Sequence, residues 1–415
     1  MATLGKQCNS RELHRRDAES RRTSGWRGSH PGFSATPRLS GGVPHRSFRL
    51  LRVGLALLAA AGGGVVGSCQ YKESHLARRA PSGGPAVTAE GPEDMASTAR
   101  VGTRAPGAYR PRIRNYFIAA EDVSWDYAPL GRNAIKDEMG LGPWGKVRVF
   151  AKTRYVEYTD STFTVRKPQP RHLGILGPTI RAVVGDTLRV HFVNWGKEPY
   201  SLHPHGVIYA KDDEGAGYAG IPGKGHAIAP GESYTYTWEV RERSGPGPRD
   251  GSSVVWLYHS HVNSDFNIFS GLVGTIVITA ADKATEDARP VDVDREFVTL
   301  FLIFDENAFG QAFEGNFKHA INGFLFGNLP GLRMKKGERV RWYLVGLGNE
   351  ADLHTPHWHG ETVVHLGRRT DVIELLPASM HAADMVAENP GTWMFHCHVS
   401  DHMMAGMQAL YTIEP

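Results

Sequence analysis

Four short His-X-His pairs most constrain what this chain of 415 residues can fold into. Residues i and i+2 of a β-strand point to the same face of a sheet, so each pair places two imidazoles side by side. Imidazoles grouped in this way suit copper, zinc or iron, and do not suit magnesium or calcium. A lone histidine would need no such explanation, but four matched pairs indicate a metal protein. The pairs are His203 with His205, His259 with His261, His357 with His359, and His396 with His398.

The fourth pair belongs to a longer run of metal-binding side chains. Cys397 lies inside the pair, His402 and Met407 follow it, and His354 lies upstream. Two histidines, a thiolate and a long axial methionine are the ligands of blue-copper electron-transfer sites. The alternative makes Cys397 a small buried hydrophobe and Met407 core filler, but it leaves the histidines unexplained. Because neighbouring strand residues point to opposite faces, Cys397 is expected to serve a different metal from the flanking histidines and to link the two sites covalently.

The chain from Tyr109 onward reads as two blocks of β-strands, with no long amphipathic helix. Short β-branched and aromatic runs alternate with Gly, Pro and Asp turns, which is typical of a Greek-key β-sandwich of antiparallel strands. The predicted domains are 109–282 and 294–415, and each carries one His-X-His pair that follows a strand and a second pair late in the domain. This matching indicates duplication of one unit, so we predict an all-β fold of two tandem sandwiches. The expected strands are Lys146–Tyr155, Thr187–Asn194, Ser233–Val240, Val254–Tyr258, Val273–Thr279, Phe297–Phe304, Arg339–Val345, Asp371–Leu376, Gly391–Phe395 and Gln408–Ile413.

The first 108 residues differ in composition from the two blocks. Residues 1–52 contain eleven Lys or Arg and three acids, and we predict a disordered basic segment or a mis-assigned start. Residues 53–69 contain an apolar run that ends at Cys69, and they resemble the signal h-region and lipobox of a bacterial lipoprotein. The alternative is a signal peptide cut elsewhere, with Cys69 incidental. Residues 70–108 are rich in Pro, Gly, Ala and Ser and are predicted to be a flexible tether.

Charge and cysteine content exclude two classes of protein. The formal net charge is +4, but residues 1–52 carry +8 of it, so the rest of the chain is acidic at −4. A basic nucleic-acid-binding body is therefore excluded, and no nucleic-acid partner is expected. The three cysteines, Cys8, Cys69 and Cys397, are too few for a disulfide framework.

Several short sequence motifs resemble those of the multicopper oxidases, in particular those of the ceruloplasmin and hephaestin branch. In the first block they are GPTIR from Gly177, HGV from His205, EGA from Glu214 and YHSH from Tyr258. In the second block they are FDEN from Phe304, HAING from His319, GNL from Gly327 and GTW from Gly391. The resemblance covers about residues 110–415, and it implies that both sandwiches are cupredoxin-like.

The resemblance also implies which residues bind copper, four ions in each functional unit. The residues that match the type 1 copper ligands of the family are His354, Cys397, His402 and Met407. The two that match the type 2 ligands are His203 and His357, and the six that match the type 3 pair are His205, His259, His261, His359, His396 and His398. Ser260 stands in the first block where Cys397 stands in the second, so the first domain is expected to lack a type 1 copper.

The number of domains implies an oligomer. The trinuclear cluster of the family needs four histidines from each of two domains, and two-domain relatives build it between neighbouring subunits. Head-to-tail contacts of this kind close into rings when the rotation permits. We therefore expect a homotrimer, whose six domains would resemble the arrangement of ceruloplasmin.

The resemblance implies an oxidase. A reductant gives single electrons to the type 1 copper near His402, Cys397 passes them to His396 and His398, and dioxygen is reduced to water at the trinuclear cluster. Glu214 lies where the family places an acidic group near the cluster, and we predict that it donates protons. The alternative makes Glu214 a solvated acid of its loop.

The reducing substrate is left open by the sequence. Asp401 adjoins His402 and matches an acid that resembles part of the ferroxidase iron site, and Glu306 is a second candidate acid. Carboxylates there would bind Fe(II) and favour the Fe(III) product. Met403 and Met404 would instead favour Cu(I), because thioethers are soft ligands. Phenols or amines are the third option, and no run of acids supports a calcium site in residues 223–228.

Two other functions compete with the oxidase. A copper nitrite reductase also has two such domains in a trimer, but it carries its thiolate in the first domain and lacks the full set of eight histidines. A non-catalytic copper-storage lipoprotein would not need Cys397 between two sites. In all three cases the expected location is the bacterial cell envelope, periplasmic or on the outer surface, with a lipid anchor at Cys69.

Overall fold

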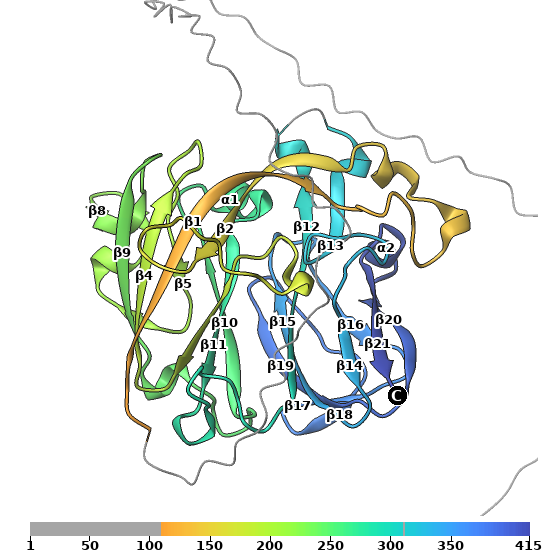
Figure 1. Cartoon of the computed structure of the whole chain (residues 1–415). Coiled ribbons are helices and arrows are strands. Elements are labelled where there is room, and N and C mark those ends of the chain that lie inside the picture. The colour runs from red at the N-terminus through yellow and green to blue at the C-terminus, as the bar shows by residue number, and fades with distance from the viewer. Residues whose placement is uncertain (1–108, 310–311) are drawn as a thin grey trace, which may run out of the picture. The chain divides into compact units, whose positions relative to one another are not determined.

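The structure, a computed structural model, describes residues 109–309 and 312–415 (Figure 1). The predicted basic segment, signal h-region, Cys69 and tether lie outside these residues. The described part of the chain is all-β, with two sandwiches in tandem and two short α-helices, α1 (Ser264–Ser270) and α2 (Ser400–Met404). No helix in these two ranges is long and apolar enough to cross a membrane.

The first sandwich packs a five-stranded sheet against a four-stranded sheet. Along β4 the side chains of Leu188, Val190 and Phe192 are buried while Arg189 is exposed, the alternation expected of a strand with one face on the core. The five-stranded sheet has the order β2 (Val149–Tyr158), β1 (Ile113–Asp126), β4 (Thr187–Asn194), β9 (Ser233–Glu239), β6 (Ile208–Tyr209). The second sheet has the order β3 (Thr179–Val183), β11 (Val273–Thr279), β10 (Ser253–His259), β5 (His203–Pro204), and a separate hairpin pairs β7 (Gly217–Tyr218) with β8 (Ile221–Pro222).

The second sandwich packs a six-stranded sheet against a four-stranded sheet. The six-stranded sheet has the order β13 (Phe317–Ile321), β12 (Arg295–Asp305), β15 (Arg339–Gly346), β19 (Met380–Val386), β17 (Val363–His365), β18 (Arg368–Thr370). The other has the order β14 (Arg333–Lys335), β21 (Gln408–Glu414), β20 (Gly391–Cys397), β16 (Pro356–Trp358). Short 3-10 helices lie at Asp137–Met139, Gly142–Gly145, Arg171–Leu173, Lys211–Asp213, Lys224–His226, Glu242–Ser244, Ala281–Lys283, Glu306–Phe309 and Glu314–Asn316.

Strand β12 explains how the two sandwiches are joined. Phe301 and Ile303 point into the core of the second sandwich, whereas Leu300 and Leu302 pack in a separate cluster with residues of the first, such as Leu257. Because both faces of β12 are buried, its sequence is an almost unbroken apolar run instead of an alternating one.

The predicted two-sandwich fold is confirmed, but two details of the strand prediction are wrong. Residues Asp371–Leu376 form no strand. Instead, Val372 makes an isolated bridge to His357 and Leu375 makes one to His354, so the segment supports these two histidines. The sheets are also not wholly antiparallel: β1 with β4, β3 with β11, β12 with β15 and β14 with β21 are parallel. Parallel partners need a crossover connection. In each of these pairs, the chain between the two partners passes through the opposite sheet of the same sandwich.

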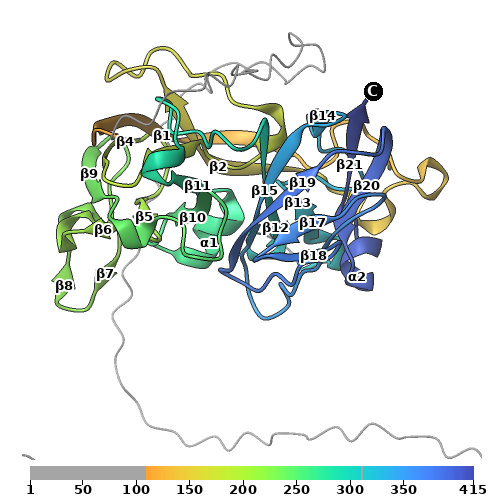
Figure 2. The same ribbon diagram turned by 90° about the horizontal axis from the view of Figure 1, so that it is seen from below.

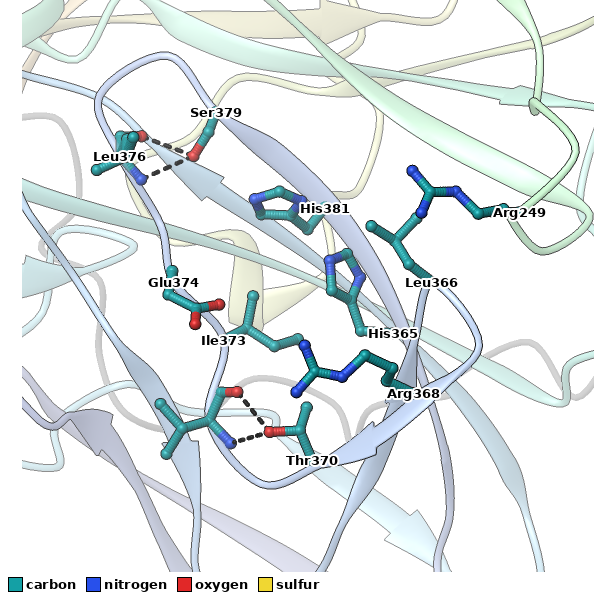
Figure 3. Close-up of a pocket in the computed structure, with 11 residues that line it drawn as sticks. Arg249, His365, Leu366, Arg368, Thr370, Ile373, Glu374, Leu376, Ser379 and His381 are labelled. Carbon is teal, nitrogen blue, oxygen red and sulfur yellow. Dashed lines mark hydrogen bonds between the residues drawn. The ribbon is translucent and has the colours of Figure 1, made fainter. Parts of the chain in front are cut away.

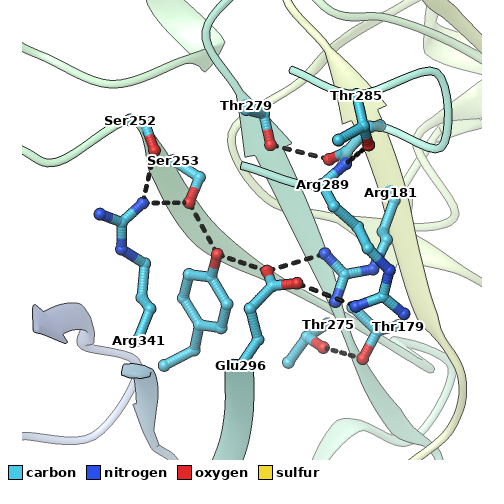
Figure 4. Close-up of polar contacts among 12 residues, drawn as sticks. Thr179, Arg181, Ser252, Ser253, Thr275, Thr279, Thr285, Arg289, Glu296 and Arg341 are labelled. Carbon is cyan, nitrogen blue, oxygen red and sulfur yellow. Dashed lines mark hydrogen bonds and ion pairs between the residues drawn. The ribbon is translucent and has the colours of Figure 1, made fainter. Parts of the chain in front are cut away.

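A buried polar network also connects the sandwiches (Figure 4). Glu296 of β12 accepts hydrogen bonds from Arg181 of β3 at 2.8 Å, Arg289 at 3.0 Å and Tyr343 at 2.9 Å. Tyr343 shares a hydrogen bond of 2.7 Å with the hydroxyl of Ser253. Burial raises the pKa of Glu296, but the two guanidiniums outweigh it and lower the pKa below the ordinary value. The carboxylate is therefore held ionised between two cations.

We expect Glu296→Gln to lower the free energy of unfolding by about 3 kcal/mol, because it leaves buried guanidinium charge without its partner. Since the pKa of Glu296 is lower in the folded state, its stabilisation is present above the ordinary pKa and is lost as the pH falls through the folded-state value. The free energy of unfolding of Glu296→Gln should therefore not show this decrease at low pH. Urea unfolding at several pH values measures both effects. The control is Glu239→Gln at the exposed pair with Arg241, where a change of at most about 0.5 kcal/mol is expected; equal losses in the two variants would contradict the assignment.

Candidate metal centres

The residues predicted for a type 1 copper come together inside the second sandwich. His354 Nδ1 and His402 Nδ1 are 3.2 Å apart, and they lie 3.9 Å and 3.7 Å from Cys397 Sγ. All three side chains are buried. Met407 is also fully buried, and backbone hydrogen bonds join it to both Cys397 and His402. Two imidazole nitrogens and a sulfur facing one point form the trigonal donor set of a blue-copper site.

The surroundings of this group favour the thiolate. Burial raises the pKa of Cys397, but hydrogen bonds from His354, His402 and the backbone N–H of Thr355 outweigh it and lower the pKa to about 6. His354 uses its other nitrogen, Nε2, to contact Asp352 Oδ1 at 3.1 Å. Asp352 was missed by the sequence reasoning. It is fully buried and accepts the backbone N–H groups of Ile303 and Asn349, so it fixes the ring orientation in the way that carboxylates commonly do for metal-binding histidines.

The first sandwich gathers a second group, which we call the first histidine group: His203, His205, His259 and His261. Pairing of β5 with β10 sets His203 opposite His259. His205 Nε2 and His259 Nε2 are 3.3 Å apart, and the ring of His261 lies 5.1 Å from that of His203. Ser260 points away from this group to the N–H of Ser201 and to Asn267, so no thiolate occupies its position.

The second sandwich repeats the arrangement in the second histidine group: His357, His359, His396 and His398. Pairing of β16 with β20 sets His357 opposite His396. His359 Nε2 and His396 Nε2 are 3.1 Å apart, and the rings of His357 and His398 are 5.3 Å apart. The group of His354, Cys397 and His402 is called here the thiolate group. The same strand β20 thus directs Cys397 to the thiolate group and His396 to the second histidine group.

Backbone carbonyls orient the rings of both histidine groups. Nδ1 of His203 lies 2.7 Å from Glu214 O, Nδ1 of His357 lies 2.9 Å from Asp371 O, and Nδ1 of His396 lies 2.7 Å from Cys397 O. With Nδ1 engaged, Nε2 is left for a metal. Burial, with nearby imidazoles, lowers the pKa of His205 to about 4, of His259 to about 3 and of His396 to about 4. These rings are therefore neutral at pH 7, as metal binding requires, and the donor set fits copper.

Each histidine group is open on one side. His261 and His398 are exposed, while His259 and His396 at the base of each group are buried. Among the described residues, every ring contact of a histidine group is made within its own sandwich. In both views β5, which carries His203, and β20, which carries His396, lie in different sandwiches (Figures 1 and 2). One chain therefore presents two separate sets of four.

The structure gives the three predicted acids different surroundings. Asp401 is exposed at the start of α2, next to the buried His402. Glu214 is mostly buried near the first histidine group and accepts hydrogen bonds from Lys211 and Tyr218. Burial raises the pKa of Glu214, but these two donors outweigh it and lower the pKa, so the group is ionised at pH 7.

Glu306 does not line an open mouth, contrary to its predicted role. Its side chain is buried in an ion pair with Lys152 and also accepts a hydrogen bond of 2.5 Å from Tyr127. Lys152 additionally donates to the carbonyl of Phe269. A carboxylate buried with its own cation is not free to bind an incoming metal ion, so Glu306 is a structural link between the sandwiches.

His319 was also missed, although it lies in the HAING phrase. Its ring centroid is 5.1 Å from that of His402, and its Nδ1 is buried without a hydrogen-bond partner among the described residues. Burial, with His402 and His354, lowers its pKa to about 3. A neutral imidazole with a free nitrogen thus adjoins the thiolate group.

A cavity of about 500 Å³ lies elsewhere on the second sandwich (Figure 3). Its walls come from the β17–β18 hairpin and the following loop, with His365, His381 and Glu374 facing it and Arg249 reaching in from the first sandwich. None of the predicted copper ligands lines it. It is therefore distinct from the three metal groups.

A double sandwich that holds one thiolate group and two histidine groups defines a copper-binding redox protein. Multicopper oxidase family models match residues 172–283 and 303–415. The chain belongs to the multicopper oxidase family, in its branch of ceruloplasmin- and hephaestin-like proteins.

Relatives of known name support this assignment. Over 338 residues the chain is 39% identical to ferroxidase HEPHL1 of Homo sapiens, which covers 72% of this chain and 29% of that protein. It is 40% identical over 345 residues to hephaestin of Homo sapiens (72% and 28% covered) and 36% identical over 340 residues to ceruloplasmin of Homo sapiens (72% and 30% covered). The chain thus spans about three tenths of the length of these relatives.

Solved structures show the same fold. The crystal structure of a multicopper oxidase superposes with a TM-score of 0.51 at 23% identity, covering 75% of this chain and 94% of that one. Blue copper oxidase from Nitrosomonas europaea superposes with a TM-score of 0.50 at 21% identity, covering 74% and 86%.

Proposed function

We propose that the chain is a subunit of a multicopper oxidase that oxidises a small reductant one electron at a time and reduces dioxygen to water. The observation that carries this proposal is the joining of two kinds of site on one strand: Cys397 in the thiolate group lies between His396 and His398 of a histidine group. A storage protein has no use for this covalent link.

Copper bound in these groups supplies one-electron redox chemistry, with the thiolate group facing the reductant and the histidine groups facing dioxygen. The side chains provide the geometry. Asp352 holds the ring of His354, and the lowered pKa of Cys397 keeps its sulfur ionised. The carbonyls of Glu214, Asp371 and Cys397 hold three other rings with Nε2 free.

The two histidine groups belong, in this proposal, to one oxygen-reducing centre shared between subunits. Each group has four imidazoles and an open side, and the family's trinuclear cluster needs eight. A head-to-tail contact that brings the first histidine group of one chain to the second histidine group of the next would close three chains into a ring. The functional unit would then be a homotrimer with four coppers for each chain.

A combined measurement separates this function from its rivals. Copper-loaded protein should show the visible thiolate-to-copper absorption and should take up oxygen with a reductant. Copper binding without either property would indicate storage, and turnover of nitrite in place of oxygen would indicate a nitrite reductase. The intact set of eight histidines and the position of Cys397 in the second domain favour the oxidase over both.

Glu214 is proposed to relay protons to the oxygen site. Because its pKa is lowered, the carboxylate must first accept a proton from solvent or from Lys211 before it passes one on. Glu214→Gln should slow oxygen uptake by about 100-fold, the low end of general acid–base effects. The control is Asp212→Asn in the same loop, whose carboxylate pairs with Lys224. Unchanged turnover in Glu214→Gln would reject the role.

Fe(II) is the substrate that we propose first. An exposed carboxylate, Asp401, and a half-buried imidazole, His319, whose Nδ1 has no hydrogen-bond partner among the described residues, adjoin His402, and one relative is named as a ferroxidase. Met404, also exposed on α2, makes Cu(I) the second candidate.

Steady-state rates under air with Fe(II), Cu(I) and a phenol test this choice. Asp401→Asn should raise the KM for Fe(II) by about tenfold, since it removes one charge from the approach of a cation. The KM for a neutral phenol should stay unchanged and serves as the control within the same enzyme. An equal effect on both substrates would show that Asp401 shapes the site without binding the ion.

The proposal places the oxidase in the bacterial cell envelope, with a lipid anchor at Cys69. The apolar run before Cys69 supports export. Mass spectrometry of the mature N-terminus would identify either a lipidated Cys69 or a cut elsewhere.

A further inference from the structure

The cavity of about 500 Å³ on the second sandwich contains two guanidiniums that the chain leaves unpaired (Figure 3). Arg368 belongs to β18, and Arg249 comes from the first sandwich. Neither guanidinium makes a hydrogen bond or an ion pair with the described part of the chain, whereas Arg181 and Arg341 between the sandwiches are bound to carboxylates. A guanidinium presents a planar fork of donors that matches a carboxylate, so the cavity has unused donors for an anion.

Much of the remaining wall of the cavity is apolar. Leu366, Ile373 and Leu376 line it together with the rings of His365 and His381. Leu366 and Leu376 are 40% and 57% exposed, so a ligand would cover apolar surface that the chain leaves to solvent. Concave sites of this size, with apolar walls and a few polar groups that fix orientation, are typical of small-molecule binding.

The turn of the β17–β18 hairpin carries backbone strain at the edge of the cavity. Two residues, Leu366 and Gly367, join the strands, and both have positive φ, at 49° and 78°. A two-residue turn of this kind favours Asn followed by Gly, because a bulky side chain is strained at positive φ. Leucine here adds an apolar side chain to the cavity wall at a cost to the turn, and such strain is common at ligand-binding sites.

The two imidazoles make a metal ion the alternative occupant. The ring centroids of His365 and His381 are 4.8 Å apart, and Nδ1 of His365 contacts the carbonyl of Ala382 at 3.0 Å, which leaves Nε2. However, no third metal-binding side chain of residues 109–309 and 312–415 joins them, whereas three come together in each of the metal groups. The two guanidiniums in the same cavity would also repel a cation. The charges therefore favour an anion.

We propose that this cavity binds a small organic acid with one carboxylate on an apolar body. The carboxylate pairs with Arg249 and Arg368, whose exposed side chains are free to turn toward it, and the apolar body lies against Leu366 and Leu376. Glu374 is the acid among the lining residues, and Figure 3 shows it and Arg249 on opposite sides of the imidazole pair. Its charge disfavours a second carboxylate at that end.

The test measures benzoate binding to copper-loaded, full-length protein by isothermal titration calorimetry. Benzoate should bind, and benzamide, which has the same ring without the charge, should bind at least about tenfold more weakly. Arg249→Gln and Arg368→Gln should each raise the Kd for benzoate by about tenfold, because each removes a charge-assisted hydrogen bond. The matched control is Arg369→Gln on the same strand, whose guanidinium donates to Thr362 outside the cavity, and it should leave the Kd unchanged.

Leu366→Asn tests the strained turn. Asparagine adopts positive φ more readily than leucine, so the midpoint of thermal unfolding should rise. Loss of the apolar side chain should at the same time raise the Kd for benzoate by about fivefold. A purely structural role of Leu366 would not give these opposite changes in stability and binding, and an unchanged Kd would contradict its place in the site.

Several results would overturn the anion site, and none of them depends on oxygen turnover. They are the absence of benzoate binding, an equal loss of binding in Arg369→Gln, and an unchanged Kd in both cavity-arginine variants, as benzoate bound at copper would give. Binding of Zn²⁺ without binding of benzoate, lost in His365→Ala/His381→Ala, would assign the cavity to a metal ion. Circular dichroism checks that each variant is folded, as expected for surface positions.

Discussion

Cys397→Ser should abolish the visible thiolate-to-copper absorption and lower oxygen uptake with every reductant by at least about 100-fold. Loss of a residue that only orients a ligand already costs 10- to 100-fold, and in the proposed site Cys397 is the ligand itself. It is also the covalent connection from the thiolate group to His396 and His398. The measurements are the absorption spectrum of copper-loaded protein and oxygen consumption with Fe(II) and with a phenol.

The control for this prediction is Met407→Leu. The axial methionine of a blue-copper site tunes its reduction potential, but the site forms without it. Met407→Leu should therefore keep its visible thiolate-to-copper absorption and a large part of its oxygen uptake. Serine is nearly the size of cysteine, and it occupies the matching position 260 of the first sandwich, so Cys397→Ser should fold and still bind copper in its histidine groups. Retained colour and turnover in Cys397→Ser would contradict the assignment of the thiolate group.

The metal groups could be predicted largely from the sequence because their geometry is local. A spacing of two residues on a strand fixes two imidazoles on one face, and the pairing of His203 with His259 and of His357 with His396 then brings the pairs together. The opposite directions of Cys397 and His396 follow from the same alternation.

Other features depend on contacts between distant segments, and the sequence pattern does not contain them. Glu306 meets Lys152, 154 residues away, and a carboxylate that looks available in a loop becomes half of a buried ion pair. His319 meets His402 only because β13 and α2 come together in the fold. Residues 371–376 look like a strand by composition, but their carbonyls serve a histidine ring and a turn instead of a sheet.

Mixing two inactive variants should restore oxygen reduction if the centre is shared between chains. His203→Ala/His205→Ala damages the first histidine group, and His357→Ala/His359→Ala damages the second. Each variant alone should be inactive, since every shared centre then lacks one half. In a ring of three chains that contains both variants, one of the three contacts joins an intact first group to an intact second group, so about one third of the activity should return.

The controls make this outcome specific to a shared centre. Each variant mixed with itself should stay inactive, and the thiolate group, intact in both variants, should keep its visible absorption throughout. The two variants are co-expressed with different tags, and rings that carry both tags are purified before copper loading and oxygen uptake. If the eight histidines met within one chain, each chain would lack a complete centre and no mixture could recover. Absence of recovery in rings shown to contain both tags would therefore refute the head-to-tail arrangement, whereas recovery of about one third of the activity is expected if each centre takes four imidazoles from each of two chains.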